Sequence, residues 1–167
     1  TIHSTCKFER VVMGIRLIEE KNLDGVMITP LKIIQVPGGD VSHAMKISDP
    51  GFAGFGEVYF SNIESGVVKA WKRHRKMTLN LVVSVGAIRF VMFDDRHESQ
   101  TQGMFQEVVL SKEFYYRLTV PALLWMGFQG VSENTSMLLN IADLEHLPEE
   151  VDRKAIDEIN FFWETIT

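Results

Sequence analysis

Short apolar and β-branched segments recur along this chain at intervals of roughly 8–12 residues, with turns rich in Gly, Pro and Asp between them. The strongest pair flanks Gly86, where residues 78–85 and 87–93 carry a clear hairpin signal. Similar segments occupy 41–47, 57–63, 67–71, 104–110, 114–120, 124–129 and 135–141. About eight to eleven short strands with such turns are typical of a β-sandwich or β-barrel. We therefore expect an all-β fold.

The two ends of the chain differ from this pattern. Residues 1–25 have a mixed character and end at a turn-forming Asp–Gly pair, so we interpret them as an N-terminal strand or arm. A short C-terminal helix is expected over residues 149–162, with Glu149 and Glu150 in its first turn, where the helix dipole favours anions. The chain length of 167 residues suits a single domain, 1–167.

Composition narrows the classes of partner. The formal net charge of −5 argues against a nucleic-acid partner, which requires a basic face. No apolar run approaches the roughly 18 residues of a membrane span, and no signal-peptide pattern is visible. Cys6 is the only cysteine, so no internal disulfide can form. We expect a cytoplasmic protein with neither a nucleic-acid nor a membrane partner.

Although the chain is acidic overall, residues 69–76 contain a cluster of cations. Its members, which surround Trp71 and His74, are Lys69, Lys72, Arg73, Arg75 and Lys76. The cluster is too short for a nucleic-acid duplex and suits one or two phosphates. It therefore predicts a site for an anionic ligand.

Strand geometry divides this cluster between two faces. Alternate residues of a strand share a face, so Lys72 and His74 are expected to point the same way, together with Ala70. The opposite face is expected to carry Trp71, Arg73 and Arg75. The charges in this stretch therefore need not act together.

Several sequence segments carry a family resemblance. They are EVYFS (57–61), GVVKAW (66–71), LVV (81–83) before Gly86, FDDR (93–96), VP (120–121), GF (127–128) and LN (139–140), followed by His146 and Arg153. In this order, over roughly residues 30–155, they resemble the dTDP-4-dehydrorhamnose 3,5-epimerase-like family of RmlC-like cupins. The resemblance implies a cupin jelly-roll barrel, a homodimer and a site inside the barrel with no metal and no cofactor. It also implies a nucleotide-sugar ligand, from which a base removes a proton next to the C4 ketone.

The chain departs from the family pattern at three places. Lys72 stands where relatives carry the histidine that acts as base, and Met126 stands where they carry another histidine. The tyrosine expected as acid, in the strand near residues 139–142, is absent. These departures predict an atypical active site.

Three residues are candidates for proton transfer. Lys72 can act as a base if burial or nearby cations depress its pKa. His74 offers an imidazole, a group that ordinarily titrates near neutral pH. Glu57 matches a family position that faces the pocket, and an inward carboxylate there would pair with Lys72 or His74 and orient it.

The candidates for substrate binding are Lys69, Arg96, Trp71, Tyr59, Met126 and Asn140. The resemblance links Lys69 and Arg96 to ligand phosphate or to barrel structure, and lysine and arginine both bind phosphate. The alternative for Arg96 is a salt bridge to Asp94 or Asp95 that holds its loop. Trp71 is either a stacking surface or core. Met126 indicates an apolar pocket, since methionine adapts to irregular shapes.

Metal binding is not expected, because the histidines of a metal cupin cannot be assembled here. The leading hypothesis is an epimerase or isomerase of a nucleoside-diphosphate-linked 4-keto sugar that works by metal-free acid–base proton transfer. One alternative is a barrel recruited for the cyclisation or isomerisation of a natural-product intermediate. Another is a non-catalytic module that binds nucleotide sugars.

Overall fold

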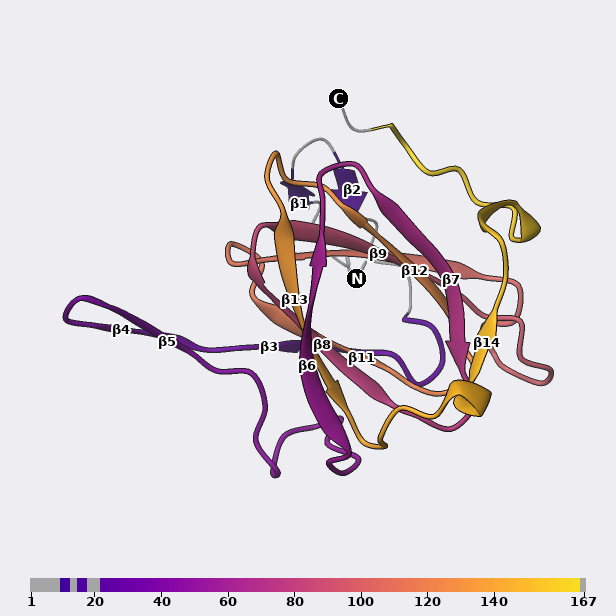
Figure 1. Ribbon diagram of the computed structural model, residues 1–167, viewed down its shortest axis with the longest axis horizontal. Coiled ribbons are helices and arrows are strands. Elements are labelled where there is room, and N and C mark those ends of the chain that lie inside the picture. Colours follow the sequence, from indigo (N-terminus) through magenta and orange to yellow (C-terminus); the bar gives the residue numbers. More distant parts are fainter. Residues whose placement is uncertain (1–9, 13–14, 18–21, 166–167) are drawn as a thin grey trace, which may run out of the picture.

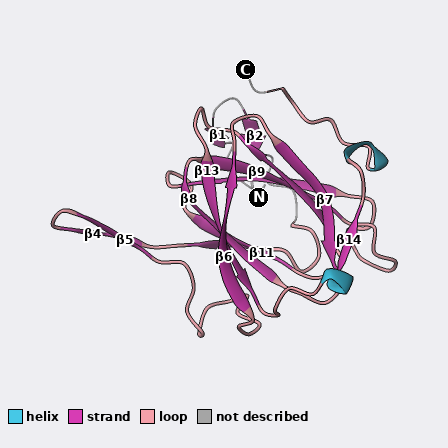
Figure 2. Ribbon diagram, in the orientation of Figure 1, coloured by secondary structure: helices cyan, strands magenta, loops and turns pink. Residues whose placement is uncertain are grey.

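The computed structural model describes residues 10–12, 15–17 and 22–165, and nearly all of their regular structure is β (Figures 1 and 2). One antiparallel sheet consists, in spatial order, of β10 (Phe105–Ser111), β9 (Ala87–Phe93), β12 (Trp125–Gly130), β7 (Val68–His74) and β14 (Val151–Arg153). The other consists of β3 (Met27–Pro30), β11 (Tyr116–Val120), β8 (Leu79–Val85), β13 (Ser136–Ala142) and β6 (Glu57–Ile63). The all-β prediction is confirmed, although strand pairing among the described residues leaves the two sheets separate and does not close them into a ring.

Two hairpins lie outside these sheets. The first pairs β1 (Arg10–Val12) with β2 (Ile15–Leu17), and the second pairs β4 (Ile33–Val36) with β5 (Gly39–Ser42). The β4–β5 hairpin projects well away from the rest of the chain (Figure 1).

The main core fills the space between the two sheets. Alternate residues of β8 and β9 point into it, as the period of two requires: Leu81 and Val83 from one sheet, Phe90 and Met92 from the other. Leu138 of β13 joins them. We call the face of each sheet that points toward this space its inward face, and the other its outward face.

A second core lies on the outward face of the β7-containing sheet. Trp71 of β7, Val91 of β9 and Trp125 of β12 are buried there, under the segment that follows β14. Phe161 and Trp163 of that segment pack onto Trp71, with ring centroids 6.2 and 5.4 Å from its own. The middle of this sheet is therefore buried on both faces.

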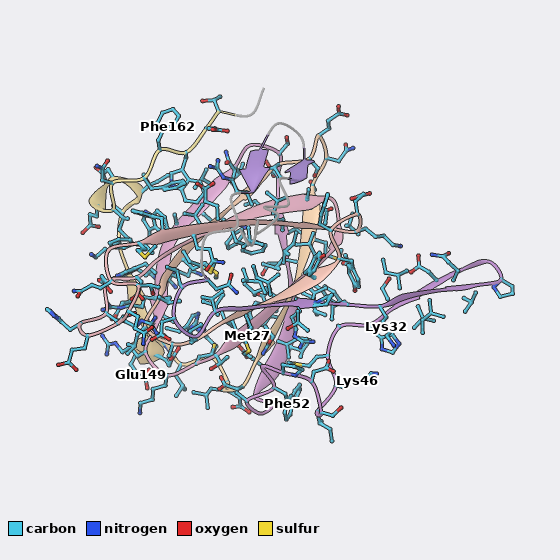
Figure 3. The ribbon with its side chains drawn as sticks, turned by 180° about the vertical axis from the view of Figure 1, so that it is seen from behind. Met27, Lys32, Lys46, Phe52, Glu149 and Phe162 are labelled. Atoms are coloured by element: carbon cyan, nitrogen blue, oxygen red, sulfur yellow. The ribbon has the colours of Figure 1, made fainter. Side chains whose placement is uncertain are left out.

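The predicted C-terminal helix over residues 149–162 is wrong. Two single 3₁₀ turns, Pro148–Glu150 and Ile156–Glu158, flank β14 instead, and no helix in the described residues is long or apolar enough to cross a membrane. β14 extends the sheet by pairing with β7, and this long-range pairing overrides the local helix signal. Beyond it, Ile159, Phe161 and Trp163 reach the sheet with a spacing of two residues, which is the period of an extended chain and not of a helix. Phe162, between them, points away (Figure 3).

The predicted N-terminal arm, residues 1–25, lies partly outside the described residues, which omit 1–9, 13–14 and 18–21. The described part contains the β1–β2 hairpin, and Leu23 is buried in the main core. The predicted turn at Asp24 and Gly25 is present, and Gly25 has a φ of 84°, which favours glycine.

A buried carboxylate organises the loop after β9. Asp94 has no exposed side-chain surface, and its oxygens accept hydrogen bonds from Arg96 Nε at 2.9 Å, Ser99 Oγ at 2.6 Å and Thr101 Oγ1 at 2.7 Å. Burial opposes ionisation of Asp94, but these donors outweigh it and hold its pKa far below the usual range. Arg96 also donates to the carbonyl of Asp24, so the network ties this loop to the chain ahead of β3.

Replacing this carboxylate is expected to destabilise the fold. Asp94→Asn removes the charge that Arg96 faces, and breaking a buried ion pair costs roughly 3–5 kcal/mol. Urea unfolding at neutral pH measures the loss. Glu98→Gln, an exposed change in the same loop, is the control and is expected to leave stability unchanged. Equal stability of Asp94→Asn and the wild type would contradict the role given to this network.

Candidate functional site

The inward face of β7 carries the first group of candidate residues. Lys72 pairs in register with Met126 of β12, and Met126 packs against the main core. Residues directly opposite one another in an antiparallel pair share a face, so Lys72 lies on the inward face. His74, two residues further along, lies on the same face, as the sequence predicts.

A bulge in β7 changes the face of one predicted residue. Met126 pairs with Lys72 and Phe128 pairs with Lys69, so two residues of β7 lie opposite the single Gly127. Ala70 therefore packs on the outward face with Trp71, and its predicted grouping with Lys72 is wrong. Lys69 lies on the inward face instead.

Trp71, proposed above for substrate binding, is only 1% exposed and lies in the outward core. The structure does not bring it to the inward face. Its indole Nε1 donates to the carbonyl of Ile156, 3.2 Å away.

Two of the clustered cations lie on the outward side and are paired with carboxylates. Arg73 contacts Asp152 at 2.9 Å and Asp95 at 3.1 Å, and its guanidinium lies 4.5 Å from the centroid of the Trp125 ring. Arg75 contacts Asp152 at 2.6 Å. These two arginines hold β14 and the loop after β9 against β7, so their charge is used within the fold.

Two of the clustered cations, Lys69 and Lys72, lie on the inward face together with Arg153 of β14, and we call these three the inner cations. Arg153 of β14 pairs in register with Lys72. Burial lowers the pKa of Lys72, and the like charges of Arg153 and Lys69 lower it further. Within the part of the chain that the structure describes, none of the three has a carboxylate partner. Lys69 Nζ donates to the carbonyl of Asn62, 2.9 Å away. Such a group attracts an anion.

His74 is held by a buried carboxylate that the sequence analysis did not select. Its Nδ1 lies 2.6 Å from Glu150 Oε2, and Glu150 is only 7% exposed. The other oxygen of Glu150 accepts the backbone N–H groups of Lys76 at 2.6 Å and Met77 at 2.8 Å. Burial opposes ionisation of Glu150, but His74 and these N–H groups outweigh it and lower its pKa. The carboxylate fixes the orientation of the imidazole.

The opposite wall comes from β6 and β13. Asn140 lies on the inward face between Leu138 and Ala142, which belong to the main core, and its Nδ2 donates to Ser61 Oγ at 3.1 Å. Tyr59 pairs in register with Asn140 and therefore shares this face. Burial raises the pKa of the Tyr59 phenol, and the nearby Glu57 raises it further.

Glu57 lies on this same wall, since it pairs in register with Ala142. Among the described residues no hydrogen bond joins it to Lys72 or His74, and Glu150 occupies the orienting position predicted for it. Arg96 forms the predicted alternative contact, an ion pair with Asp94 at 2.8 Å. The structure thus gathers Lys69, Lys72, His74 and Met126 on one inward face and Glu57, Tyr59 and Asn140 on the other.

Glu150 and Arg153 are the site residues to which the sequence analysis gave no role in the site, although Arg153 is among the residues that carry the family resemblance. Glu150 was assigned to the first turn of a helix, and nothing in the local sequence indicates a partner 76 residues away. The described residues contain no group of three or more His, Cys, Asp or Glu side chains that could hold a metal ion.

Comparison with known proteins identifies solved structures with the same fold. No family model matches the chain. The crystal structure of a dTDP sugar isomerase from Desulfovibrio desulfuricans G20 superimposes with a TM-score of 0.81 at 35% identity, covering 84% of this chain and 92% of that one. A dTDP-4-dehydrorhamnose 3,5-epimerase from Bacillus anthracis, solved with TDP and PPi bound, gives a TM-score of 0.77 at 17% identity, covering 89% and 90% of the two chains.

A sequence relative extends the comparison. A probable low-salt glycan biosynthesis epimerase of Haloferax volcanii, Agl13, is 32% identical over 83 residues. The match covers 49% of this chain and 53% of that relative, so it spans about half the length of each.

The Glu150 carboxylate is expected to stabilise the fold in a pH-dependent way. The pKa of Glu150 in the folded chain lies below the ordinary value of 4.5. The stability that the ionised carboxylate contributes to the fold is therefore fully present above pH 4.5 and is lost as the pH falls through the folded pKa. Glu150→Gln keeps an acceptor for the N–H groups but loses the charge next to His74. We expect the variant to be less stable than the wild type at pH 7, with a difference that narrows below pH 4.5.

Urea unfolding at a series of pH values measures this difference in free energy. Glu149→Gln is the matched control, because Glu149 is exposed and adjacent in sequence (Figure 3). A difference that is constant with pH, or that is equal in the two variants, would contradict the role assigned to Glu150.

Proposed function

Since this chain belongs to the RmlC-like cupin family, which includes a dTDP sugar isomerase, we propose that it is an epimerase or isomerase of a nucleoside-diphosphate-linked 4-keto sugar. The name of the Haloferax volcanii relative supports a place in glycan biosynthesis. The observation that carries the proposal is the contact of 2.6 Å between His74 Nδ1 and the buried Glu150, on the inward face of a fold that supports this chemistry in relatives.

His74 is the base in this proposal. With its Nδ1–H donated to Glu150, the ring presents the lone pair of Nε2, which accepts a proton from the carbon next to the ketone. The negative charge of Glu150 stabilises the imidazolium that forms, as the carboxylate does in other histidine–carboxylate pairs. The electron pair from the broken C–H bond moves into the ketone and gives an enolate.

The inner cations bind the diphosphate. Lys72, which stands at the family's base position, has Arg153 beside it in register and Lys69 on the same face. Their mutual repulsion is relieved when an anion with two or more negative charges enters the group. Lys72 therefore has a binding role here, and the proton-transfer role passes to His74.

We also assign a homodimer, as the resemblance implies. The projecting β4–β5 hairpin exposes Ile34, Val36 and Val41, and such apolar side chains are typical of surfaces that a second copy covers.

Loss of the imidazole is expected to slow proton abstraction strongly. With a panel of dTDP-linked 4-keto sugars in D₂O, NMR follows the replacement of ring protons next to the ketone by deuterium. His74→Gln is expected to slow this replacement by roughly 10²–10⁴-fold, the usual contribution of a general base. His97→Gln, at an exposed histidine, is the control and should retain the wild-type rate.

Three outcomes of this assay contradict the proposal in different ways. No exchange by the wild type with any sugar of the panel, at high protein concentration, would contradict the enzymatic function. Tight dTDP binding without exchange would favour the non-catalytic module. Full exchange by His74→Gln together with its loss in Lys72→Gln would return the base role to Lys72.

The inner cations are expected to set the affinity for the nucleotide. Calorimetric titration with dTDP should show about tenfold weaker binding for Lys72→Gln or Arg153→Gln, which corresponds to about 1.4 kcal/mol for each lost charge. Raising the salt concentration should reduce the difference in dTDP affinity between the wild type and each variant, because salt screens partly exposed charges. Lys46→Gln removes an exposed cation outside the two inward faces and serves as control. Equal losses in all three variants would indicate a general charge effect and would contradict this site.

A further inference from the structure

One amine among the inner cations is left without a partner. Arg153 carries a guanidinium, which stays protonated in proteins. Lys69 Nζ donates to the carbonyl of Asn62, 2.9 Å away. Lys72 Nζ has neither a hydrogen-bond acceptor nor a carboxylate among the residues that the structure describes. These residues therefore offer no contact that holds Lys72 in its ammonium form.

The surroundings of Lys72 favour the neutral amine. Partial burial lowers the pKa of Lys72, and the charges of Arg153 and Lys69 lower it further. The cause lies in the strand pairing, because Arg153 is directly opposite Lys72 across the β7–β14 pair (Figure 1) and the bulge turns Lys69 to the same face. A lysine beside other cations is an arrangement that makes the amine a nucleophile toward carbonyl groups.

The neighbours that favour the amine also bind anions. Arginine holds phosphate through two parallel N–H groups, and lysine holds it as a point charge. Directly opposed residues of an antiparallel pair have their Cβ atoms about 5 Å apart. Lys72, Lys69 and Arg153 are all exposed, so a ligand reaches them from solvent. A small molecule can therefore place a phosphate on Lys69 and Arg153 and a carbonyl carbon at Lys72 Nζ.

We propose that Lys72 is a covalent capture site for phosphorylated aldehydes and ketones, which it binds as a Schiff base. The lone pair of the amine attacks the carbonyl carbon, and the C=O electron pair moves to oxygen, which takes a proton from the attacking nitrogen. Solvent supplies a second proton, the C–O bond breaks, and the oxygen leaves as water. The nitrogen lone pair then forms the C=N bond. The protonated product keeps one positive charge beside the phosphate, which stabilises it.

This capture goes beyond the function proposed above and does not depend on it. In that function the diphosphate of the sugar nucleotide meets Lys72 as an ammonium group. A phosphorylated aldehyde reacts instead with the neutral amine, before any diphosphate binds. Both kinds of ligand use Lys69 and Arg153, so they exclude one another. Phosphorylated carbonyl compounds are therefore expected to compete with nucleotides for the inner cations.

Pyridoxal 5′-phosphate, a phosphorylated aldehyde, is the probe for this site. The full chain is incubated with the probe at neutral pH, borohydride reduces the Schiff base to a stable secondary amine, and peptide mass spectrometry locates the modified lysine. At limiting probe we expect Lys72 to be the lysine modified, and inorganic pyrophosphate in excess to prevent the modification. Pyridoxal without its phosphate should modify Lys72 roughly tenfold more slowly, as expected for the loss of an ionic contact of about 1.4 kcal/mol.

Four variants separate the amine from its neighbours. Lys72→Arg keeps the charge but removes the nucleophile, so modification at this position should be lost while pyrophosphate still binds. Lys69→Gln and Arg153→Gln keep the amine but each removes a phosphate contact, and modification of Lys72 should become roughly tenfold slower in both. Lys112→Arg is the control, because Lys112 is paired with Asp40 at 2.6 Å, outside the inner cations, and the wild-type rate at Lys72 is expected.

Other outcomes overturn the inference. Equal modification of many lysines, with no protection by pyrophosphate, would show ordinary surface reactivity. Equal rates with pyridoxal and its phosphate would show that Lys69 and Arg153 take no part. Sugar-proton exchange by a chain that captures no probe at Lys72 would overturn this inference and leave the proposed function intact. Capture at Lys72 without any exchange would support this inference while contradicting the proposed function.

Discussion

The site depends on one irregularity in strand pairing. Between Lys69 and Lys72, two residues of β7 lie opposite the single Gly127 of β12. A regular strand would place residues 69 and 72 on opposite faces, because faces alternate. The bulge instead turns both lysines inward and puts Ala70 and Trp71 outward. Gly127 is required there, since a Cβ at that position would lie 2.6 Å from the Ala70 Cβ and 2.9 Å from Trp163.

The segment after β13 contacts both faces of the β7-containing sheet. On the inward side it supplies Glu150 to His74 and Arg153 to the inner cations. On the outward side its Trp163 covers Trp71, and Asp152 pairs with the two outward arginines. This extended segment thus gives Arg73 and Arg75 a carboxylate partner and leaves Lys69 and Lys72 without one among the described residues. A helix in its place would present neither set of contacts at a spacing of two residues.

The sequence predicts most of the strands and much of one wall of the site, because both follow from local periodicity. The predicted strand over residues 41–47 is wrong beyond Ser42, where β5 ends. The segment around Gly86 gives β8 and β9, and strand alternation correctly puts Lys72 and His74 on one face and Trp71 and Arg73 on the other. Three features could not be read from local patterns. The bulge depends on Gly127, far along the chain; Glu150 meets His74 across 76 residues; and β14 forms because the edge of β7 is available.

The displaced histidine has a geometric consequence. Moving a side chain two positions along a strand keeps its face and shifts it by about 7 Å, since each residue advances roughly 3.3 Å. His74 therefore faces the same space as a base at position 72 would, but it lies opposite Val151 of β14 instead of Arg153 and further along β7 from Lys69. A ligand anchored by its diphosphate near Lys69 would present a different ring position to a base displaced in this way. Under the function proposed above, the base and the diphosphate site therefore stand at a changed spacing, which would be a physical route to a different regiochemistry on the same class of sugar.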